Sequence, residues 1–361
     1  MFIGRTLRLA AAGLASLLIL FFASTWLTTY HPAAVQSEPV FNKSPAPLLT
    51  PGQKLKVLSW NIQFMAGKNH VFFFDLPNYA GPDERPSPDD ISKTIKAVAR
   101  VIKKENPDLI LLQEVDDGAK RTDYRDQLAE LLSLLPQAYT SHASAFYWKA
   151  FYVPHPRIMG SVGMKLSIIS KYRISKAFRH QLALKPENII SQQFDTKRAV
   201  LEAHLPVEKS KDLVVMDTHL ESFGQGTNVM EKQIKQIENL LEKLSKAGLP
   251  WIIGGDFNLL PPGRAYAALA SEQKIYFKST TEILPLFAKY QAVPGLKEVN
   301  SRDHERWFTH FPNDPKVKKP DRTIDYIFLS NKILTGKHYV RQFDALNISD
   351  HFPVITELRL P

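Results

Sequence analysis

The sequence predicts an α/β fold in which two packed β-sheets are flanked by helices and preceded by one N-terminal transmembrane helix. Short apolar segments of strand length are numerous, and few helical patterns separate them, which favours packed sheets. An uninterrupted apolar segment near the N-terminus predicts the membrane helix. The chain of 361 residues is 44% hydrophobic and 23% charged, which is typical of a globular protein and not of a disordered one.

The apolar segment from Leu9 to Leu27 contains no charged residue and approaches the roughly 20 residues that cross a bilayer as a helix. Arg5 and Arg8 precede it, which favours a short cytoplasmic N-terminus, residues 1–8, and a folded domain outside the cytoplasm. The alternative is a cleaved signal peptide, although its apolar core is usually shorter. We therefore expect a single-pass membrane protein.

Residues 28–53 are rich in proline, serine and alanine, and this composition predicts a flexible tether. The folded domain is then expected over residues 54–361, which suffice for one large α/β domain. The tether would keep this domain close to the membrane.

Within the domain, period-two alternation or short apolar runs predict strands, and apolar residues along one face predict helices. The clearest helix follows Ser87, which can cap it, and Pro88, which suits a first turn. The predicted helices are residues 87–106, 122–135 and 229–247. The predicted strands are residues 54–60, 108–115, 162–170, 198–205, 212–219, 250–255, 325–330 and 353–358.

Charge and cysteine content restrict the chemistry. The net charge is +10, and most of it lies beyond the first 50 residues. A basic domain tends to bind phosphates in nucleic acids, anionic lipids or small phosphoesters, although a solvated basic surface explains the same charge. The chain has no cysteine, which excludes disulfides, thiolate nucleophiles and cysteine-ligated zinc.

Several predicted strands begin or end at an acid, an amide or a histidine, where side chains can gather at one edge of a sheet. Each has an ordinary structural explanation when it is taken alone, such as a turn, an Asx turn after two glycines, an ion pair or a surface histidine. These residues are Asn61, Glu114, His219, Asp256, Asn258, Asp325, Asp350 and His351.

Together these side chains have a chemical logic. A hard cation such as Mg²⁺ needs one or two carboxylates and an amide, because it keeps several waters. The lack of cysteine and of a His-x-x-x-His helix motif disfavours zinc. Two histidines can supply a base and a cationic partner for phosphate near neutral pH. The set therefore predicts hydrolysis of a phosphate ester by water.

Six motifs in the chain resemble those of the endonuclease/exonuclease/phosphatase superfamily, in the same order and over nearly the whole folded part. GGDFN and SDHFP are individually fairly specific, and the ordered set is strongly so. The motifs are LSWNIQF (58–64), LLQEVD (111–116), MDTHLES (216–222), IIGGDFNLLP (252–261), TIDYIFLS (323–330) and SDHFPV (349–354).

The resemblance implies a four-layer α/β sandwich with its site at one end of the two sheets. It also implies a Mg²⁺-dependent hydrolase of phosphate esters, with Mn²⁺ as the alternative ion. Asn61 and Glu114 match the family's metal-site residues, and Asp350 matches the aspartate that helps to bind the ion.

The same resemblance implies roles for five catalytic residues. His351 matches the histidine that activates water or stabilises the attacked phosphate, and Asp325 matches the acid that orients it. Asp256 and Asn258 match the pair that positions the nucleophile and the phosphate. His219 matches the histidine that contacts the phosphate oxygens in many branches.

The substrate is the open question. The stretch GMKLSIISKYRI (163–174) departs from the family pattern at Lys165 and Arg173, and residues 146–156 form an aromatic-basic segment around Trp148. That segment is either a substrate-binding or lipid-binding loop or a packed hairpin. We expect Trp148, Lys165 and Arg173 to contact substrate.

Three functions compete. A membrane-proximal phosphodiester such as a lipid headgroup is favoured, because the anchor and tether would hold the domain near the bilayer. A nuclease acting on DNA or RNA is the alternative, and a non-catalytic interaction domain is a remote one, because it would predict loss of the polar set. The sequence indicates no protein partner.

Overall fold

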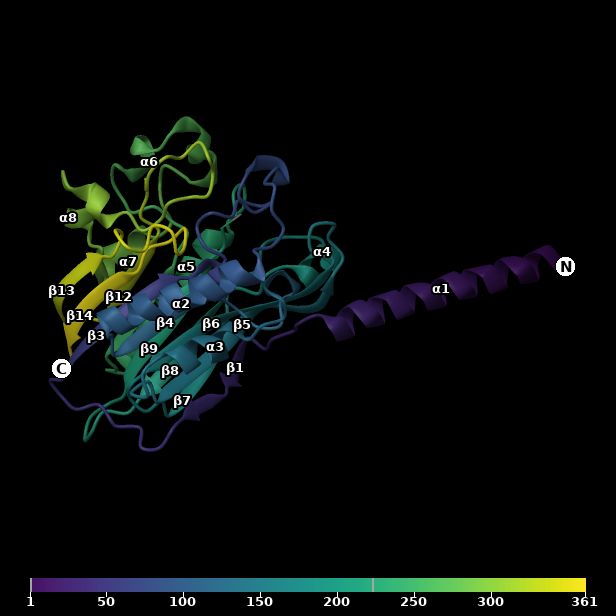
Figure 1. Cartoon of the computed structure of the whole chain (residues 1–361). Helices are drawn as coiled ribbons and strands as arrows, with labels where there is room; N and C mark the ends of the chain where they lie inside the picture. The colour runs from purple at the N-terminus through teal and green to yellow at the C-terminus, as the bar shows by residue number, and fades with distance from the viewer. Residues whose placement is uncertain (1, 223) are drawn as a thin grey trace.

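Two seven-stranded mixed β-sheets pack face to face in the computed structural model, which describes residues 2–222 and 224–361 (Figure 1). The first sheet has the order β13 (Leu334–Val340), β14 (Val354–Arg359), β3 (Lys54–Asn61), β4 (Leu109–Asp116), β6 (Gly160–Ser170), β5 (Ser141–Val153), β2 (Val40–Asn42). The second has the order β1 (Val35–Glu38), β7 (Lys176–Gln181), β8 (Ala199–Leu205), β9 (Leu213–His219), β10 (Trp251–Asp256), β12 (Asp325–Leu329), β11 (Gln291–Val293).

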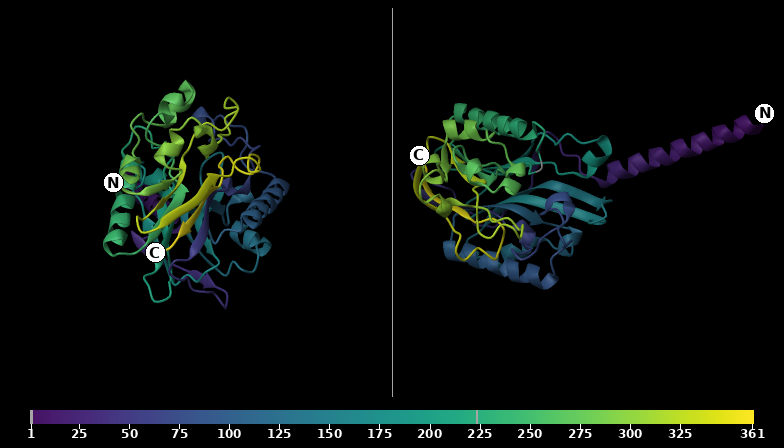
Figure 2. Two further views of the ribbon diagram at one scale, coloured as in Figure 1. Left: turned by 90° about the vertical axis from the view of Figure 1, so that its left-hand side faces the viewer. Right: turned by 90° about the horizontal axis from the view of Figure 1, so that it is seen from above.

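Helices cover both outer faces of this pair of sheets (Figure 2). On the first sheet lie α2 (Pro88–Glu105) and α3 (Gln127–Leu134), and on the second lie α5 (Val229–Lys246) and α7 (Leu284–Lys289). One apolar cluster joins α2, the first sheet and the inner face of the second, and another joins α5 and α7 to the outer face of the second. The predicted four-layer sandwich is confirmed.

The helix predicted over residues 87–106 is α2, and its ends follow the local chemistry. The Ser87 side chain accepts a hydrogen bond from the Asp90 backbone N–H, and Pro88 occupies the first turn. The helix ends at Asn106, which adopts a left-handed conformation with φ of 50°. Ile91, Ile95 and other apolar residues on one face are buried against the first sheet.

Other helices and strands differ from their predicted boundaries. The helix predicted from residue 122 begins only at Gln127, because Asp123 is left-handed and Asp126 caps the helix through the Ala129 N–H. The aromatic segment 146–156 lies largely in β5, which forms a long antiparallel hairpin with β6. Strands β7, β11 and β13 were not predicted, because their short patterns take their stability from neighbouring strands.

The N-terminal helix α1 (Phe2–Thr28) projects away from the sandwich (Figure 1). Its segment Arg8–Thr28 is long and apolar enough to cross a membrane, and none of it is buried in the protein. A signal sequence has the same properties.

The flexible tether predicted over residues 28–53 is wrong for its central part. Strand β1 pairs with β7, and β2 pairs with β5, so residues 35–42 complete one edge of each sheet. The unpaired backbone groups of these two edges supply hydrogen bonds that composition alone does not reveal. Three further short helices, α4 (Ile189–Phe194), α6 (Ala265–Ala268) and α8 (Leu296–Val299), lie in the loops.

Candidate active site

The predicted site residues meet at one end of the sandwich. Strands β3 and β4 are parallel, as are β9 and β10 in the other sheet, and Asn61 Nδ2 donates to Asp256 Oδ2 at 3.1 Å across the two sheets, so the carboxyl ends of both pairs lie at the same end of the molecule. Asn61 ends β3, and His219 and Asp256 end β9 and β10 as neighbours in register. Asp325 opens the antiparallel β12 directly opposite Asp256. Strand polarity therefore gathers residues from distant parts of the chain.

The two glycines of the GGDFN motif allow this close packing. A Cβ on Gly255 would lie 1.9 Å from the Thr218 carbonyl oxygen of the adjacent strand, and Gly255 has φ of 151°. A Cβ on Gly254 would lie 2.6 Å from Leu111 in the facing sheet. The glycines thus let β10 approach both neighbours and place Asp256 at the site.

Glu114 reaches the site through an irregularity in β4. The register between β4 and β6 shifts between Leu112 and Val115, and Glu114 itself has φ of 57°. Such a bulge redirects a side chain relative to a regular strand. Its carboxylate accepts a hydrogen bond from Asn61 Nδ2 at 3.0 Å.

A buried histidine is held between two aspartates. His351 Nδ1 lies 2.9 Å from Asp325 Oδ2, and its Nε2 lies 3.5 Å from Asp256 Oδ2. Burial lowers the pKa of His351, but the carboxylates of Asp325 and Asp256 outweigh it and hold the pKa well above its usual range. Burial raises the pKa of Asp256 to about 7, although His351 opposes this shift.

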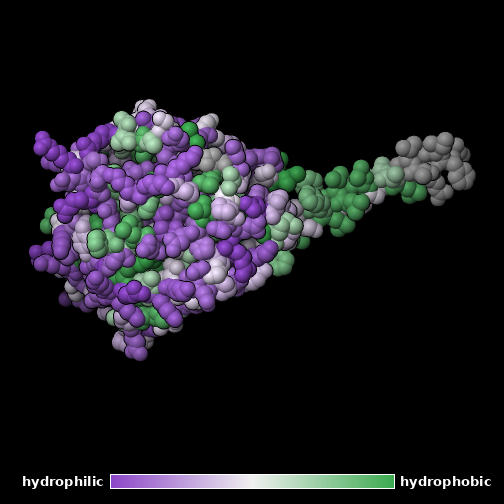
Figure 3. All heavy atoms as spheres, turned by 45° about the horizontal axis from the view of Figure 1, so that its top comes forward, coloured by the Kyte–Doolittle hydropathy of each residue, from purple (hydrophilic) through white to green (hydrophobic). Residues whose placement is uncertain are grey.

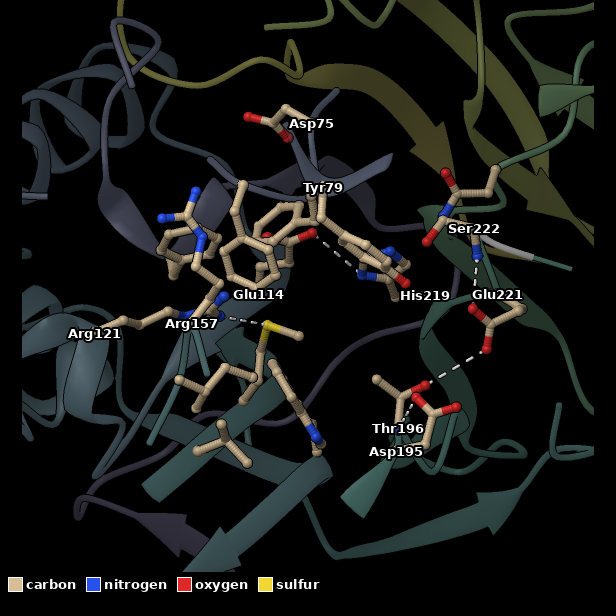
Figure 4. A pocket seen from close by; sticks show the side chains of 18 of the residues that line it. Asp75, Tyr79, Glu114, Arg121, Arg157, Asp195, Thr196, His219, Glu221 and Ser222 are labelled. Carbon is tan, nitrogen blue, oxygen red and sulfur yellow. Dashed lines mark hydrogen bonds and ion pairs between the residues drawn. The ribbon is translucent and has the colours of Figure 1, made fainter. Parts of the chain in front are cut away.

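His219 completes this group from β9. Its Nε2 lies 3.4 Å from Asp256 Oδ2, and its Nδ1 lies 3.2 Å from the Tyr147 hydroxyl and 3.8 Å from Glu114. Figure 4 shows Glu114 and His219 pointing toward each other. Burial, aided by Arg198, holds the pKa of His219 well below its usual range, so the ring is neutral.

Asn258 lies beside this cluster on a left-handed residue with φ of 51°. Its backbone N–H donates to Asp256 Oδ1 at 2.9 Å, and its Nδ2 donates to the Leu220 carbonyl at 3.1 Å. The sharp turn after β10 therefore fixes Asp256 and presents Asn258 at the same edge.

The acidic residues of the site fit a hard divalent cation. Burial and the nearby Asp350 carboxylate both raise the pKa of Glu114, so the two acids repel each other in a place where water does not screen them. A cation would remove this repulsion, and the donors are the carboxylate and amide oxygens that Mg²⁺ prefers. Histidine and carboxylate donor atoms also come within 4.8 Å of one another in two groups, His310–Asp350–His351 and Asp256–Asp325–His351.

Several residues of the site were not predicted. His310 Nε2 lies 3.8 Å from Asp350 Oδ2, and Asn313 Nδ2 donates to Asp75 Oδ2 at 3.0 Å. Burial, followed by the Asp350 carboxylate, raises the pKa of Asp75 to about 7. Tyr147 is fully buried against His219. Tyr147 lies within the aromatic segment 146–156 that the sequence singles out. His310, Asn313 and Asp75 lie in loops outside the six motifs, so local pattern did not mark them.

A cavity of about 840 Å³ is lined by most of the site residues, namely Asp75, Glu114, His219, Asp256, Asn258, His310, Asn313, Asp350 and His351. Among the predicted substrate residues, Trp148 lines the cavity, and its Nε1 donates to the Phe194 carbonyl at 2.7 Å.

The other two predicted substrate residues lie elsewhere. Lys165 is buried in ion pairs with Asp117 at 2.9 Å and Asp126 at 3.6 Å, and it is not part of the cavity lining. Arg173 is exposed beyond the far end of β6, where its backbone N–H donates to Pro47. A departure from a motif does not by itself place a side chain at a site, because alternate residues of a strand face opposite sides.

Comparison with known proteins identifies the family and the fold of the chain. The family model described as "Endonuclease/Exonuclease/phosphatase family" matches residues 58–351. Among solved structures, an endonuclease/exonuclease/phosphatase protein from Beutenbergia cavernae is 22% identical with a TM-score of 0.57, covering 85% of this chain and 72% of that one. ANGEL2, described as a 2',3'-cyclic phosphatase, is 14% identical with a TM-score of 0.54, covering 90% and 98%.

The catalytic domain of human Nocturnin is 17% identical with a TM-score of 0.50, covering 89% of this chain and 96% of that one. At these identities the likeness shows the fold. None of the curated proteins compared with the chain matches it. Because the family model spans most of the folded part, the chain belongs to the endonuclease/exonuclease/phosphatase family, whose members are hydrolases of phosphoester bonds.

Proposed function

We propose that this protein is a Mg²⁺-dependent phosphodiesterase in which water attacks the phosphorus atom. The observation that carries the proposal is the placement of His351 between Asp325 and Asp256, beside the repelling acids Glu114 and Asp350. This combination supplies a positioned proton-transfer group and an anionic cation site within one cavity.

Each residue has a role that follows from its contacts. Asp325 forms a hydrogen bond with His351 Nδ1, so the other ring nitrogen, Nε2, is the atom directed toward Asp256 and the substrate. Asp256 then positions the attacking water, and His351 either moves its proton or stabilises the attacked phosphate. The neutral ring of His219 and the side-chain amide of Asn258, which both lie beside Asp256, would contact the phosphate oxygens.

The cation would be held by Asn61, Glu114 and Asp350, with Mn²⁺ as the alternative to Mg²⁺. When bound, it supplies positive charge that stabilises the charge developing on the phosphoryl oxygens. The Asn61 amide already lies between Glu114 and Asp256, at 3.0 and 3.1 Å, and so fixes the spacing of the two acids.

The preferred substrate is a phosphodiester near the membrane, with a lipid headgroup first. Helix α1 is the supporting feature, since it would hold the domain at the bilayer. A nuclease is the second candidate, because Phe73, Tyr79 and Trp148 bring aromatic rings to the cavity on which bases could stack. We propose residues 1–8 as cytoplasmic, 9–27 as the anchor and the sandwich, which begins with β1 at Val35, as an extracytoplasmic catalytic domain.

The first test uses the purified full chain and bis-p-nitrophenyl phosphate, with p-nitrophenyl phosphate as the monoester control. We expect turnover of the diester that is lost in excess chelator and restored by Mg²⁺ or Mn²⁺. Full turnover in excess chelator would refute the metal-dependent reaction.

The second test compares substrates side by side with Mg²⁺. The same preparation is offered sphingomyelin vesicles, phosphoinositide vesicles, plasmid DNA and single-stranded RNA. Headgroup release is expected to exceed nucleic acid cleavage. Plasmid cleavage without release from any lipid would reverse the order of the two candidates.

A further inference from the structure

The β5–β6 hairpin extends beyond the catalytic end of the first sheet, toward α1. Strand β3 ends at Asn61 opposite Gln113, whereas the hairpin continues pairing to Val153 and Gly160. Strand β4 pairs with β6 as far as Met164, opposite Trp148, and the part of the hairpin from Trp148 to Val153 projects beyond it by about 15 Å at the usual strand rise. Both Figures 1 and 2 show this hairpin and α4 at the end of the sandwich from which α1 leaves.

Helix α1 is joined directly to this end. Thr29, just after α1, forms an antiparallel bridge with Ala150 of β5. The Thr29 hydroxyl also lies 3.4 Å from Gln193 Oε1 of α4. Helix α4 packs on the hairpin, where Phe194 contacts an apolar cluster around Ala150. The three elements therefore form one continuous structure, in contrast to a domain on a loose tether.

Large apolar side chains are exposed here. Phe151 is 78% exposed and Ile189 is 76% exposed. Together with Tyr152, Met159 and Ile190 they form what we name the hairpin–α4 surface. Figure 3 shows apolar atoms where α1 joins the domain. Clustered exposed apolar residues of this kind mark an interaction site.

The catalytic cavity borders the same surface. Ile190 and Phe194 of α4 line the cavity, as do Val153 and Ile158 at the tip of the hairpin. Residues on one side of these elements therefore face the catalytic groups, while Phe151 and Ile189 are not among the cavity-lining residues.

We infer that the hairpin–α4 surface inserts into the membrane that α1 crosses and turns the cavity toward the lipid headgroups. The occupant is a bilayer, because this surface continues directly into a helix of membrane-spanning length and apolarity. The substrate is then a phospholipid diester of the same bilayer. This second part rests on the proposed function, whereas the insertion of the surface does not.

The chain has no cysteine, so single cysteines can be labelled cleanly in the full-length protein. The Phe151→Cys variant is labelled with the fluorophore bimane and reconstituted in phosphatidylcholine nanodiscs. These nanodiscs contain spin-labelled lipid, which quenches bimane that lies within the bilayer. Leu334→Cys is the matched control, because Leu334 is 66% exposed and pairs with Arg359, which lies opposite Lys54 at the end of β3 away from the site. We expect loss of most bimane fluorescence at Phe151→Cys and background quenching at Leu334→Cys.

Equal, background quenching at both positions would overturn the insertion. Spontaneous disulfide formation between two copies through Phe151→Cys would also overturn it, since a second copy would then cover the surface. Neither readout requires catalytic activity, so a failure of the proposed function leaves this test interpretable.

A second measurement tests the orientation of the cavity. Phe151→Asp combined with Ile189→Asp should reduce headgroup release from vesicles by about tenfold or more, because two charges replace inserted apolar side chains. Turnover of bis-p-nitrophenyl phosphate should stay unchanged, as should both activities of Leu334→Asp. Equal loss on the vesicle and the soluble diester would overturn the role in lipid access.

Discussion

The position and the charge state of each residue in the site depend on a few contacts. Both ring nitrogens of His351 lie beside carboxylates. The preceding residue, Asp350, is held by a hydrogen bond from its backbone N–H to the Gln63 side-chain oxygen at 3.1 Å. Burial raises the pKa of Asp350, but His310 and His351 outweigh it and keep that pKa below its usual value. The acid therefore stays ionised as a cation ligand requires.

His351→Ala and Asp256→Asn should each lower kcat on bis-p-nitrophenyl phosphate by about 10² to 10⁴, the usual contribution of a positioned acid or base. Asp325→Asn should cost less than His351→Ala, because Asp325 acts on the ring and not on the substrate. Arg173→Ala is the control, since Arg173 is exposed away from the cavity. Circular dichroism checks the fold, and near-normal turnover of His351→Ala would contradict these roles.

At the scale of elements, a buried carboxylate on β8 forms an ion pair with a histidine on β7. Glu202 on β8 accepts hydrogen bonds from His180 on β7 at 2.9 Å and from His204 at 2.7 Å. Burial raises the pKa of Glu202, but the two imidazoles outweigh it and lower the pKa to about 2. The folded state thus holds this carboxylate ionised more strongly than the unfolded state does.

Because the folded pKa lies below the unfolded value, Glu202 stabilises the fold at higher pH. This contribution is complete above about pH 4.5 and is lost as the pH falls toward 2, amounting to about 3 kcal/mol. Glu202→Gln should therefore show a shallower fall in the free energy of unfolding across this window, measured by urea titration at several pH values. Exposed Glu208→Gln is the control. Parallel pH profiles for Glu202→Gln and the unmodified chain would contradict the assignment.

The close packing of β9 against β10 depends on the glycine at position 255. Gly255→Ala should lower the melting temperature clearly, because its Cβ would overlap the Thr218 carbonyl oxygen and the two backbones would have to separate. Gly226→Ala is a matched control, since Gly226 also has positive φ but its Cβ would meet no atom of the described residues within 4 Å. Equal melting temperatures for the two variants would show that β10 can shift without cost.

For the whole molecule, the relation of α1 to the sandwich decides where the enzyme works. Residues 35–42 pair with β5 and β7, so a shortened chain that begins at residue 53 would lack two edge strands as well as the membrane helix. Experiments on the membrane question therefore need the full chain.

The protein should remain in the membrane fraction after carbonate washing, because residues 9–27 are apolar and none of Arg8–Thr28 is buried in the protein. Protease added to intact cells or spheroplasts should degrade the catalytic domain if it lies outside the cytoplasm. N-terminal sequencing provides the check, since a mature terminus near residues 25–35 would reveal a cleaved signal peptide.

Local pattern was enough for much of this molecule. The sequence determined α2 and α5, most central strands and the six motifs, because periodicity and capping are local, and a strand that ends in Asn61 or Asp256 presents a polar side chain wherever it packs. Family membership followed from the order of the motifs.

Tertiary structure alone decided the rest. Edge strands β1 and β2 form because a neighbouring edge offers hydrogen bonds, and Glu114 points into the site because β4 bulges against β6. Tyr147 and Asp75 lie at the site because they contact residues far away in the chain. Lys165 lies outside the site because it pairs with Asp117, which is also distant in the chain. The end of the sandwich that carries α1 is likewise set by long-range pairing, which no local pattern encodes.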